Sequence, residues 1–242
     1  MPNKFTYRSG EKELLDEFNS SNELLFKNLK ELDILNRTTG GHATSLKGVK
    51  QLVTNHHKTY HVVDLGCGGG DSLKAMAVWA RQNNYKLRLT GVDINPIVIE
   101  YFKIHCSDYP EISGTVSGYR EYIHKTESID IVHCSLFCHH LSDEQLKELF
   151  IHFRQHIRTG FIINDLHRYW LAYYSAWLFP RLLNGTPLAK NDGPVSVLRG
   201  FKYDELISLL KKANIPNYSL SKERIFRFLI VAKTETNESI EG

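Results

Sequence analysis

Apolar residues over the first 56 positions recur with the period of an amphipathic helix. Leu25, Leu29 and Leu32 fall on one helical face, and Ser20 with Glu23 forms a capping box ahead of them. A pair of glycines at 40–41 ends this helix, and a second helix follows. Its apolar side consists of Leu46, Val49, Leu52 and Val53. The pattern therefore predicts a helical cap over residues 1–57.

From Tyr60 onward the pattern changes to short β-branched apolar runs that alternate with helical periods. Such alternation predicts a parallel sheet with helices on both faces. The predicted strands cover 60–65, 86–92, 112–117, 129–134 and 159–164, and the predicted helices cover 71–83, 96–105 and 143–156.

The last third of the chain begins with an apolar helix, predicted over 167–184, and a loop with a turn at Asp192-Gly193-Pro194. Another helix, marked by Leu206, Leu209 and Leu210, ends at Ile215-Pro216. Two strand-like runs within 217–234 predict an antiparallel hairpin, and the polar tail from Glu235 is expected to fray. We expect residues 58–242 to form one domain with a lid-like insertion at 168–200.

Composition narrows the class of protein. With 242 residues and 42% hydrophobic content, the chain can bury the core of a globular domain. The net charge of +3 comes from scattered basic residues, which argues against a nucleic-acid partner. Neither a signal segment nor a spanning helix is apparent, and the spacing of the four cysteines resembles no disulfide framework, so we expect a cytoplasmic protein with reduced thiols and no stable membrane insertion.

The chemistry centres on residues 62–71, VVDLGCGGGD, where a strand, a glycine-rich turn and a helix start follow one another. Such a turn brings backbone N–H groups against a nucleotide-type ligand. The dinucleotide pattern GxGxxG fails here, because Asp71 stands at the third glycine and would face a pyrophosphate. Asp71 is more simply explained as the N-cap of its helix.

An acid followed by GxGxG fits a different ligand. The Asp64 carboxylate can pair with the ammonium group of S-adenosylmethionine, whereas it would repel a phosphate. One strand later, in LTGVDINP, Asp93 can accept hydrogen bonds from the ribose hydroxyls and Ile94 can cover the adenine. Two motifs thus favour the same cofactor.

In order and spacing, VVDLGCGGG, GVDINP and IDIVHCSLFCHHL resemble the class I S-adenosylmethionine-dependent methyltransferases, in particular the ubiquinone/menaquinone-biosynthesis-like branch that methylates small molecules. The resemblance, strongest over 60–164, implies an α/β, Rossmann-like, seven-stranded, mostly parallel sheet with a C-terminal antiparallel hairpin. Gly118 and Tyr119 replace the acid that often contacts adenine in this family. The expected cofactor-binding residues are Arg37, Asp64, Gly66, Cys67, Gly68, Asp93, Ile94, Tyr119 and Cys134.

The acceptor is expected beyond the carboxyl ends of the fourth and fifth strands, where CSLFCHHLSD and NDLHRYW follow. Alignment should supply most of the acceleration, since well-oriented reactants gain roughly 7–11 kcal/mol. A phenol or enol acceptor would also need a base, and the candidates are His139, His140 and His167. No metal is expected, because adjacent histidines splay apart on a helix.

The insertion at 168–200 carries aromatic and aliphatic residues on nearly every face of its helix, which favours a lid over a hydrophobic acceptor or, alternatively, a dimer interface. Arg168 and Arg199 are interpreted either as binding an anionic group or as pairing with Asp165 and Asp192. Arg37 is expected to reach the cofactor carboxylate if the N-terminal helices close the site. The candidate substrate residues are Asn164, Arg168, Tyr173 and Arg199.

The function predicted from these features is methyl transfer from S-adenosylmethionine to a hydroxyl, or secondarily a carbon, of a hydrophobic, aromatic or polyketide-like small molecule, by a monomer or homodimer. Two alternatives stay open: an NAD(P)-dependent oxidoreductase, and a non-catalytic S-adenosylmethionine-binding protein. Base-modifying methyltransferases are disfavoured, because residues 135–138, SLFC, replace the Asn/Asp-Pro-Pro-aromatic motif that the family resemblance would require.

Overall fold

The computed structural model describes residues 4–17 and 21–234. The chain enters through a short 3₁₀ helix, η1 (Leu14–Glu17), followed by α1 (Asn22–Thr38) and α2 (Gly41–Leu52). Ser21 caps α1 by accepting a hydrogen bond from the Leu24 N–H at 3.4 Å, whereas the predicted cap Ser20 lies outside the described residues. The predicted stop between the two helices is confirmed, since Gly40 has a φ of 80° there.

The predicted fold class is confirmed: a seven-stranded sheet has the order β3-β2-β1-β4-β5-β7-β6. Strands β1 to β5 are parallel, and β7 runs antiparallel to β5 and β6. The order reverses beside β1, so the carboxyl ends of β1, β2 and β4 meet where ligands bind open α/β sheets. The strands are β1 (Thr59–Leu65), β2 (Lys86–Asp93), β3 (Ile112–Val116), β4 (Ile131–Ser135), β5 (Gly160–Leu166), β6 (Tyr218–Glu223) and β7 (Arg227–Lys233).

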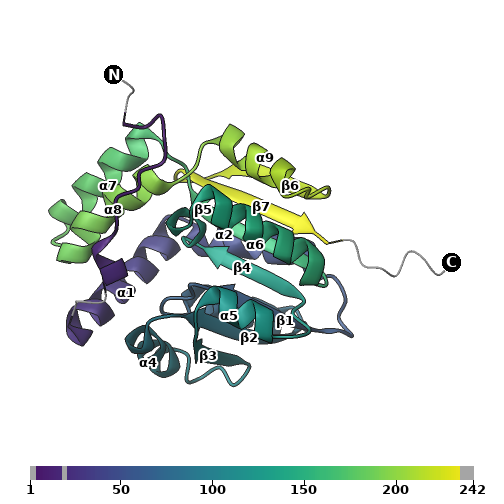
Figure 1. Ribbon diagram of the computed structural model, residues 1–242. Coiled ribbons are helices and arrows are strands. Elements are labelled where there is room, and N and C mark those ends of the chain that lie inside the picture. The colour runs from purple at the N-terminus through teal and green to yellow at the C-terminus, as the bar shows by residue number, and fades with distance from the viewer. Residues whose placement is uncertain (1–3, 18–20, 235–242) are drawn as a thin grey trace.

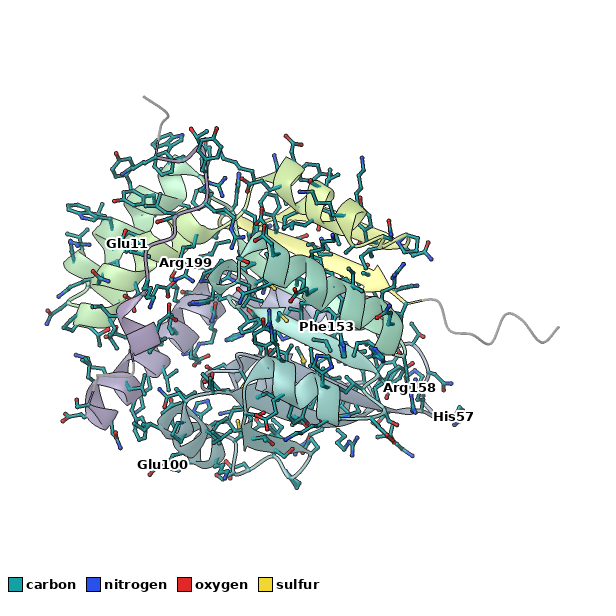
Figure 2. The ribbon with its side chains drawn as sticks, in the orientation of Figure 1. Glu11, His57, Glu100, Phe153, Arg158 and Arg199 are labelled. Carbon is teal, nitrogen blue, oxygen red and sulfur yellow. The ribbon has the colours of Figure 1, made fainter. Side chains whose placement is uncertain are left out.

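Helices cover both faces of the sheet (Figure 1). Side chains alternate along each strand, so Val62 of β1 packs on the face of α2 and α3, whereas Val63 packs on the face of α5, α6 and α9. Phe153 of α6, labelled in Figure 2, is fully buried against Phe161 of β5 with ring centroids 5.1 Å apart. The helices are α3 (Asp71–Gln82), α4 (Pro96–His105), α5 (Tyr119–Lys125), α6 (Asp143–His156) and α9 (Tyr203–Lys212).

Two further helices, α7 (Trp170–Leu182) and α8 (Pro187–Arg199), lie side by side, and the N-terminal segment runs past them before α1 (Figure 1). The predicted turn at Asp192-Gly193-Pro194 is therefore wrong. Thr186 caps α8, Pro187 occupies its first turn, and the Asp192 carboxylate accepts the backbone N–H of Leu14 at 2.8 Å. This tertiary contact and the cap outweigh the helix-breaking tendency of residues 193–194.

The short helix α5 and the position of Asp71 also differ from expectation. The predicted strand over 112–117 ends at Val116, and Tyr119 begins α5, whose seven residues are too few to show a clear period. Gly70, with a φ of 82°, is the N-cap of α3, so Asp71 is the first residue of that helix rather than its cap. There Asp71 pairs with His105 at 2.9 Å.

Within residues 4–17 and 21–234, no helix has both the length and the apolar character needed to cross a membrane. All four cysteines are free and buried. Burial raises the pKa of the Cys67 thiol well above its usual range and raises that of Cys106 to about 12, so these groups stay protonated and unreactive at neutral pH.

Candidate active site

A cavity of about 310 Å³ opens where the carboxyl ends of β1, β2 and β4 meet. The glycine loop after β1 forms one wall, and Asp64, Gly66, Cys67 and Gly68 all line the cavity. The loop needs glycine, because Gly66 has a φ of 67° and any Cβ there would collide with the Phe137 ring. The N–H groups of Gly66 and Cys67 bond to the carbonyl of Val92, which joins the loop to β2.

The Asp64 side chain is buried and held in one orientation. Its Oδ1 accepts a hydrogen bond from Nδ1 of His133, which lies beside it on β4, at 2.7 Å. His133 in turn contacts Ser45 Oγ of α2 through Nε2 at 2.8 Å. The described residues donate no hydrogen bond to the second oxygen of Asp64, so the carboxylate keeps an acceptor for a ligand in the cavity.

The row of buried polar groups continues across the sheet. Asn164 of β5 donates to Ser45 Oγ and to the Gly41 carbonyl, each at 2.9 Å. Arg227 of β7 donates to Asn164 Oδ1 at 3.3 Å and to Asn36 Oδ1 of α1 at 2.6 Å. The expected substrate residue Asn164 therefore lies in a network that fastens the turn between α1 and α2 to the sheet, and it does not line the cavity.

Asp93 lies at the end of β2, beside the glycine loop. Its Oδ2 accepts the Gly68 N–H at 3.3 Å, and its Oδ1 accepts the Asn95 N–H at 3.0 Å. Burial raises the pKa of Asp93, and the nearby charge of Asp64 adds to this effect, so a ligand that donates hydrogen bonds would stabilise the ionised form. Both carboxylates expected to bind the cofactor thus share one cavity.

Ile94 and Tyr119 also line the cavity. Ile94 is 62% exposed, and Tyr119 meets Phe137 edge to face at 5.5 Å between ring centroids. Two apolar surfaces are therefore available to a planar group. Cys134, also expected to contact the cofactor, lies fully buried in the core outside the cavity, because its side chain points from β4 to the α5–α6 face.

The N-terminal segment contributes another wall, formed by Leu15, Asp16, Leu29, Leu32 and Asn36. The expected cofactor residue at position 37 is exposed and does not line the cavity. Successive side chains of an α-helix are rotated by about 100° about its axis, so Asn36 faces the site and Arg37 does not.

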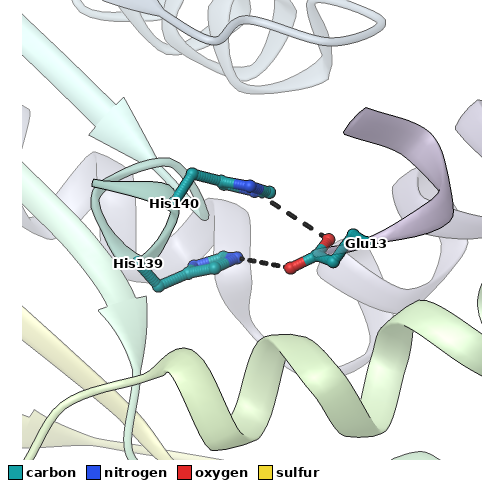
Figure 3. Close-up of side chains that lie close together, drawn as sticks. All are labelled: Glu13, His139 and His140. Carbon is teal, nitrogen blue, oxygen red and sulfur yellow. Dashed lines mark ion pairs between the residues drawn. The ribbon is translucent and has the colours of Figure 1, made fainter. Parts of the chain in front are cut away.

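Two of the three candidate histidines come together after β4, in the 3₁₀ helix η2 (Cys138–His140). Their rings lie 4.3 Å apart, and both face Glu13 of the N-terminal segment, as Figure 3 shows. His139 is 3% exposed and donates from Nδ1 to Asp165 Oδ1 at 2.7 Å. Only His140 of the pair lines the cavity, and its Nδ1 lies 3.2 Å from Asp16 Oδ1.

The third candidate, His167, lies apart from this pair. It follows β5, forms an isolated bridge with Phe201, and packs against Tyr169 and Phe228 at 5.4 and 4.8 Å between ring centroids. Burial, together with the charges of nearby lysines and an arginine, lowers the pKa of His167 to about 4. The structure therefore places it outside the cavity as a neutral, packed ring.

The two candidate substrate arginines pair within the protein, but with other partners than expected. Buried Arg168 binds the Glu205 carboxylate and donates to the Phe5 carbonyl at 3.0 Å, so the expected pairing with Asp165 is wrong. Asp165 instead accepts from His139.

Arg199 pairs with Asp16 at 3.1 Å rather than with Asp192. It also donates to the Glu11 carbonyl at 3.1 Å, and both residues are labelled in Figure 2. Together, the two arginines fasten residues 5–16 across the sheet end, which explains how the N-terminal segment reaches the cavity.

The apolar helix α7 does not line the cavity in this structure. Tyr173, a candidate substrate residue, instead meets Phe5 edge to face at 5.6 Å, with the Lys4 ammonium 3.5 Å from its ring centroid. Several large residues of α7 remain exposed, namely Trp170, Leu171, Tyr174, Trp177, Leu178 and Phe179. The predicted lid stays a prediction.

Sequence reasoning overlooked three polar residues of this region. His133 could have been found from strand register, because pairing of β1 with β4 sets it beside Asp64. Glu13 and Asp16 carried no such signal, since their approach to the histidines depends on the path of an irregular segment across the sheet.

Comparisons with known proteins agree with this geometry. The family model described as a methyltransferase domain matches residues 62–160, which contain the glycine loop, Asp93 and the histidine pair. No curated protein sequence matches the chain.

Several solved structures share the fold. Human N-acetylserotonin methyltransferase, in complex with SAM, has a TM-score of 0.64 at 14% identity, over 93% of this chain and 60% of that one. Magnesium protoporphyrin IX methyltransferase from Synechocystis PCC 6803, with bound SAM, has a TM-score of 0.58 at 14% identity, over 91% and 94%. For the citrinin polyketide synthase CMeT domain the TM-score is 0.55 at 12% identity, over 76% of this chain, which spans only 48% of that one.

At these identities the structural likeness shows the fold alone. The resemblance to the ubiquinone/menaquinone-like branch stays a prediction. Residues 62–160, less than half of the chain, are thus similar to a methyltransferase domain, and the seven-stranded sheet gathers the motifs predicted to bind S-adenosylmethionine in one cavity.

Proposed function

We propose that the protein transfers the methyl group of S-adenosylmethionine to a hydroxyl, or secondarily a carbon, of a hydrophobic small molecule. The observation that supports this most is the convergence of Asp64, Asp93 and His140 on one cavity of about 310 Å³. Two carboxylates suit the cationic and hydroxyl-bearing ends of the cofactor, and an imidazole lines the same space.

The cofactor would bind with its amino group at the free oxygen of Asp64 and its ribose hydroxyls at Asp93. Ile94 and Tyr119 would enclose the adenine between an aliphatic and an aromatic surface. His133 acts here as a positioning residue, because its hydrogen bond fixes the Asp64 carboxylate in the cavity wall.

The acceptor would lie against the N-terminal wall, where Leu15, Leu29 and Leu32 offer apolar surface. Displacement at a sulfonium methyl depends chiefly on alignment, which closing the cavity provides. Two of the three similar structures named above are methyltransferases of magnesium protoporphyrin IX and N-acetylserotonin, which supports a small-molecule acceptor.

A proton must leave a hydroxyl acceptor, and His140 is the candidate base because it lines the cavity. His139 is less suited, because it is 3% exposed, donates from Nδ1 to Asp165 Oδ1 at 2.7 Å and does not line the cavity. We therefore assign His139 a positioning role. A cytoplasmic location and a monomer or homodimer remain predictions.

Calorimetry with S-adenosylhomocysteine and, separately, NADH tests the cofactor assignment. Binding of the first and not of the second is expected, and the reverse would favour the oxidoreductase alternative.

Methyl transfer from labelled S-adenosylmethionine to a panel of phenols and enols tests the acceptor class. His140→Asn should lower turnover by about 10²- to 10⁴-fold if it is the base, whereas His57→Asn, an exposed control far from the cavity, should not. A chain that binds the cofactor but methylates nothing would support the non-catalytic alternative.

A further inference from the structure

Glu13, His139 and His140 bring three ligand atoms within 4.8 Å of one another beside the cavity, which His140 lines. Glu13 and His139 are only 4% and 3% exposed. Buried carboxylates and imidazoles normally find partners. Here Glu13 Oε1 and His139 Nε2 are both buried, and neither makes a hydrogen bond.

The spacing explains why these atoms stay without hydrogen bonds. His139 Nε2 lies 3.5 Å from Glu13 Oε1, and His140 Nε2 lies 3.9 Å from Glu13 Oε2 (Figure 3). Both separations exceed a normal hydrogen bond. Two ligands at about 2.1 Å from a tetrahedral ion are roughly 3.4 Å apart, close to these values.

The opposite ring nitrogens have carboxylate neighbours. His139 Nδ1 donates to Asp165 Oδ1 at 2.7 Å, whereas His140 Nδ1 lies 3.2 Å from Asp16 Oδ1 but outside hydrogen-bond geometry. Metal-binding histidines usually direct their second nitrogen to such a partner, which fixes the tautomer and orients the ring. Both imidazoles therefore point Nε2 toward Glu13, contrary to the splaying expected of neighbouring histidines, because η2 is a single 3₁₀ turn rather than an α-helix.

We propose that Glu13, His139 and His140 bind one divalent transition-metal ion. Two imidazoles and one carboxylate suit Zn²⁺, Fe²⁺, Co²⁺ or Mn²⁺, whereas Mg²⁺ and Ca²⁺ prefer oxygen ligands alone. Three protein ligands leave coordination positions open, as in catalytic sites.

The location suggests a use for the ion. His140 and Asp16 line the cavity, so an acceptor oxygen could complete the coordination, and the ion would then lower the pKa of that hydroxyl. This part rests on the proposed function, and in the metal-bound state His140 is a ligand rather than a base. Binding of the ion itself does not depend on the methyl acceptor.

Titration of the metal-free full chain with Co²⁺, followed by visible absorption and calorimetry, tests the proposal. We expect one saturable equivalent, displaced by Zn²⁺. Glu13→Gln and His140→Ala should each weaken binding by about 100-fold or more, and Asp165→Asn by about 10- to 100-fold through loss of the orienting hydrogen bond.

The matched control is His156→Ala, which removes one imidazole of the pair that His152 and His156 form on α6 with ring centroids 4.4 Å apart. It should leave the tight equivalent unchanged. Absence of a saturable equivalent in the folded wild type would overturn the proposal, as would loss of binding in His156→Ala but not in Glu13→Gln. Circular dichroism checks each variant for folding, and the half-buried His140 offers a variant that disturbs the core least.

S-adenosylhomocysteine affinity separates this proposal from the proposed function. If the cofactor product binds and Co²⁺ does not, the cation site fails and the methyltransferase assignment stands. If Co²⁺ binds and the product does not, the cation site stands alone.

Discussion

Replacing Asp93 with alanine should weaken binding of the cofactor product by one to two orders of magnitude. The carboxylate ends β2, lines the cavity, and already accepts N–H groups from Gly68 at 3.3 Å and from Asn95 at 3.0 Å. Each oxygen keeps a further lone pair for a ribose hydroxyl. A hydrogen bond to a charged group contributes about 1.5–3 kcal/mol, which corresponds to a roughly 10- to 150-fold change in Kd.

Part of that loss could arise from the loop rather than from the ribose, since Asp93 also holds the Gly68 N–H. Asp93→Asn separates the two, because the amide oxygen can still accept from the loop but carries no charge. We expect its Kd to fall between those of the wild type and Asp93→Ala. Asp71→Ala is the matched control, since Asp71 lines the same cavity but is paired with His105 at 2.9 Å.

Isothermal titration with S-adenosylhomocysteine measures all four proteins, after a urea titration has shown that each is folded. A Kd for folded Asp93→Ala within about threefold of wild type, or roughly 0.6 kcal/mol, would refute the ribose contact. Equal losses in Asp93→Ala and Asp71→Ala would point to a general effect of negative charge in the cavity.

Three further predictions concern stability. Gly48→Ala should destabilise the fold by about 1–3 kcal/mol, because the new Cβ would meet Ile162 Cγ2 at 2.6 Å. The higher helix propensity of alanine offsets about 1 kcal/mol of this loss. Urea unfolding measures the net change in the free energy of unfolding. Arg168→Met should cost roughly 3–5 kcal/mol by the same assay, since it removes the buried guanidinium from the Glu205 carboxylate and from the carbonyls of Phe5 and Gly200. His167→Phe should reduce the loss of stability between pH 6.5 and about 4. The folded pKa of His167, about 4, lies below the ordinary value of 6.5, so as pH falls the unfolded chain binds the proton first.

Each of these predictions has a control and a contrary outcome. Gly118→Ala should be nearly neutral, because nothing lies within 4 Å of the new Cβ. Arg120→Met, at an exposed pair with Glu148, should leave the stability nearly unchanged. Parallel stability–pH curves for wild type and His167→Phe below pH 6.5 would show that this imidazole takes up its proton equally in both states.

The parallel sheet could be predicted because its strands are nearly continuous apolar runs and its helices carry regular stripes. The two motifs predicted to bind the cofactor were local in sequence, and the structure brings them together in one cavity at the carboxyl ends of β1 and β2. The helix α8 was missed because its stability depends on Asp192 receiving the Leu14 N–H from the other end of the chain.

The least predictable part of the site was the N-terminal segment. No periodicity shows that residues 5–16 cross the sheet end, because their path is set by side chains of Arg168 and Arg199 binding their backbone carbonyls. In sequence those arginines could be interpreted either as ligand-binding residues or as members of ion pairs, since an arginine among apolar neighbours has the same appearance in either role. Glu13 could not be predicted as a site residue either, because its position depends on the path of this segment.

The buried polar row from Asp64 through His133 and Asn164 to Arg227 also affects how this protein can evolve. A single replacement leaves the neighbouring donor or acceptor stranded in the interior, a loss of about 1–3 kcal/mol. These positions should therefore change together or not at all in evolution, while the apolar residues of the N-terminal wall of the cavity can change one at a time. New acceptor preferences would then arise without changing the residues that are predicted to bind the methyl donor.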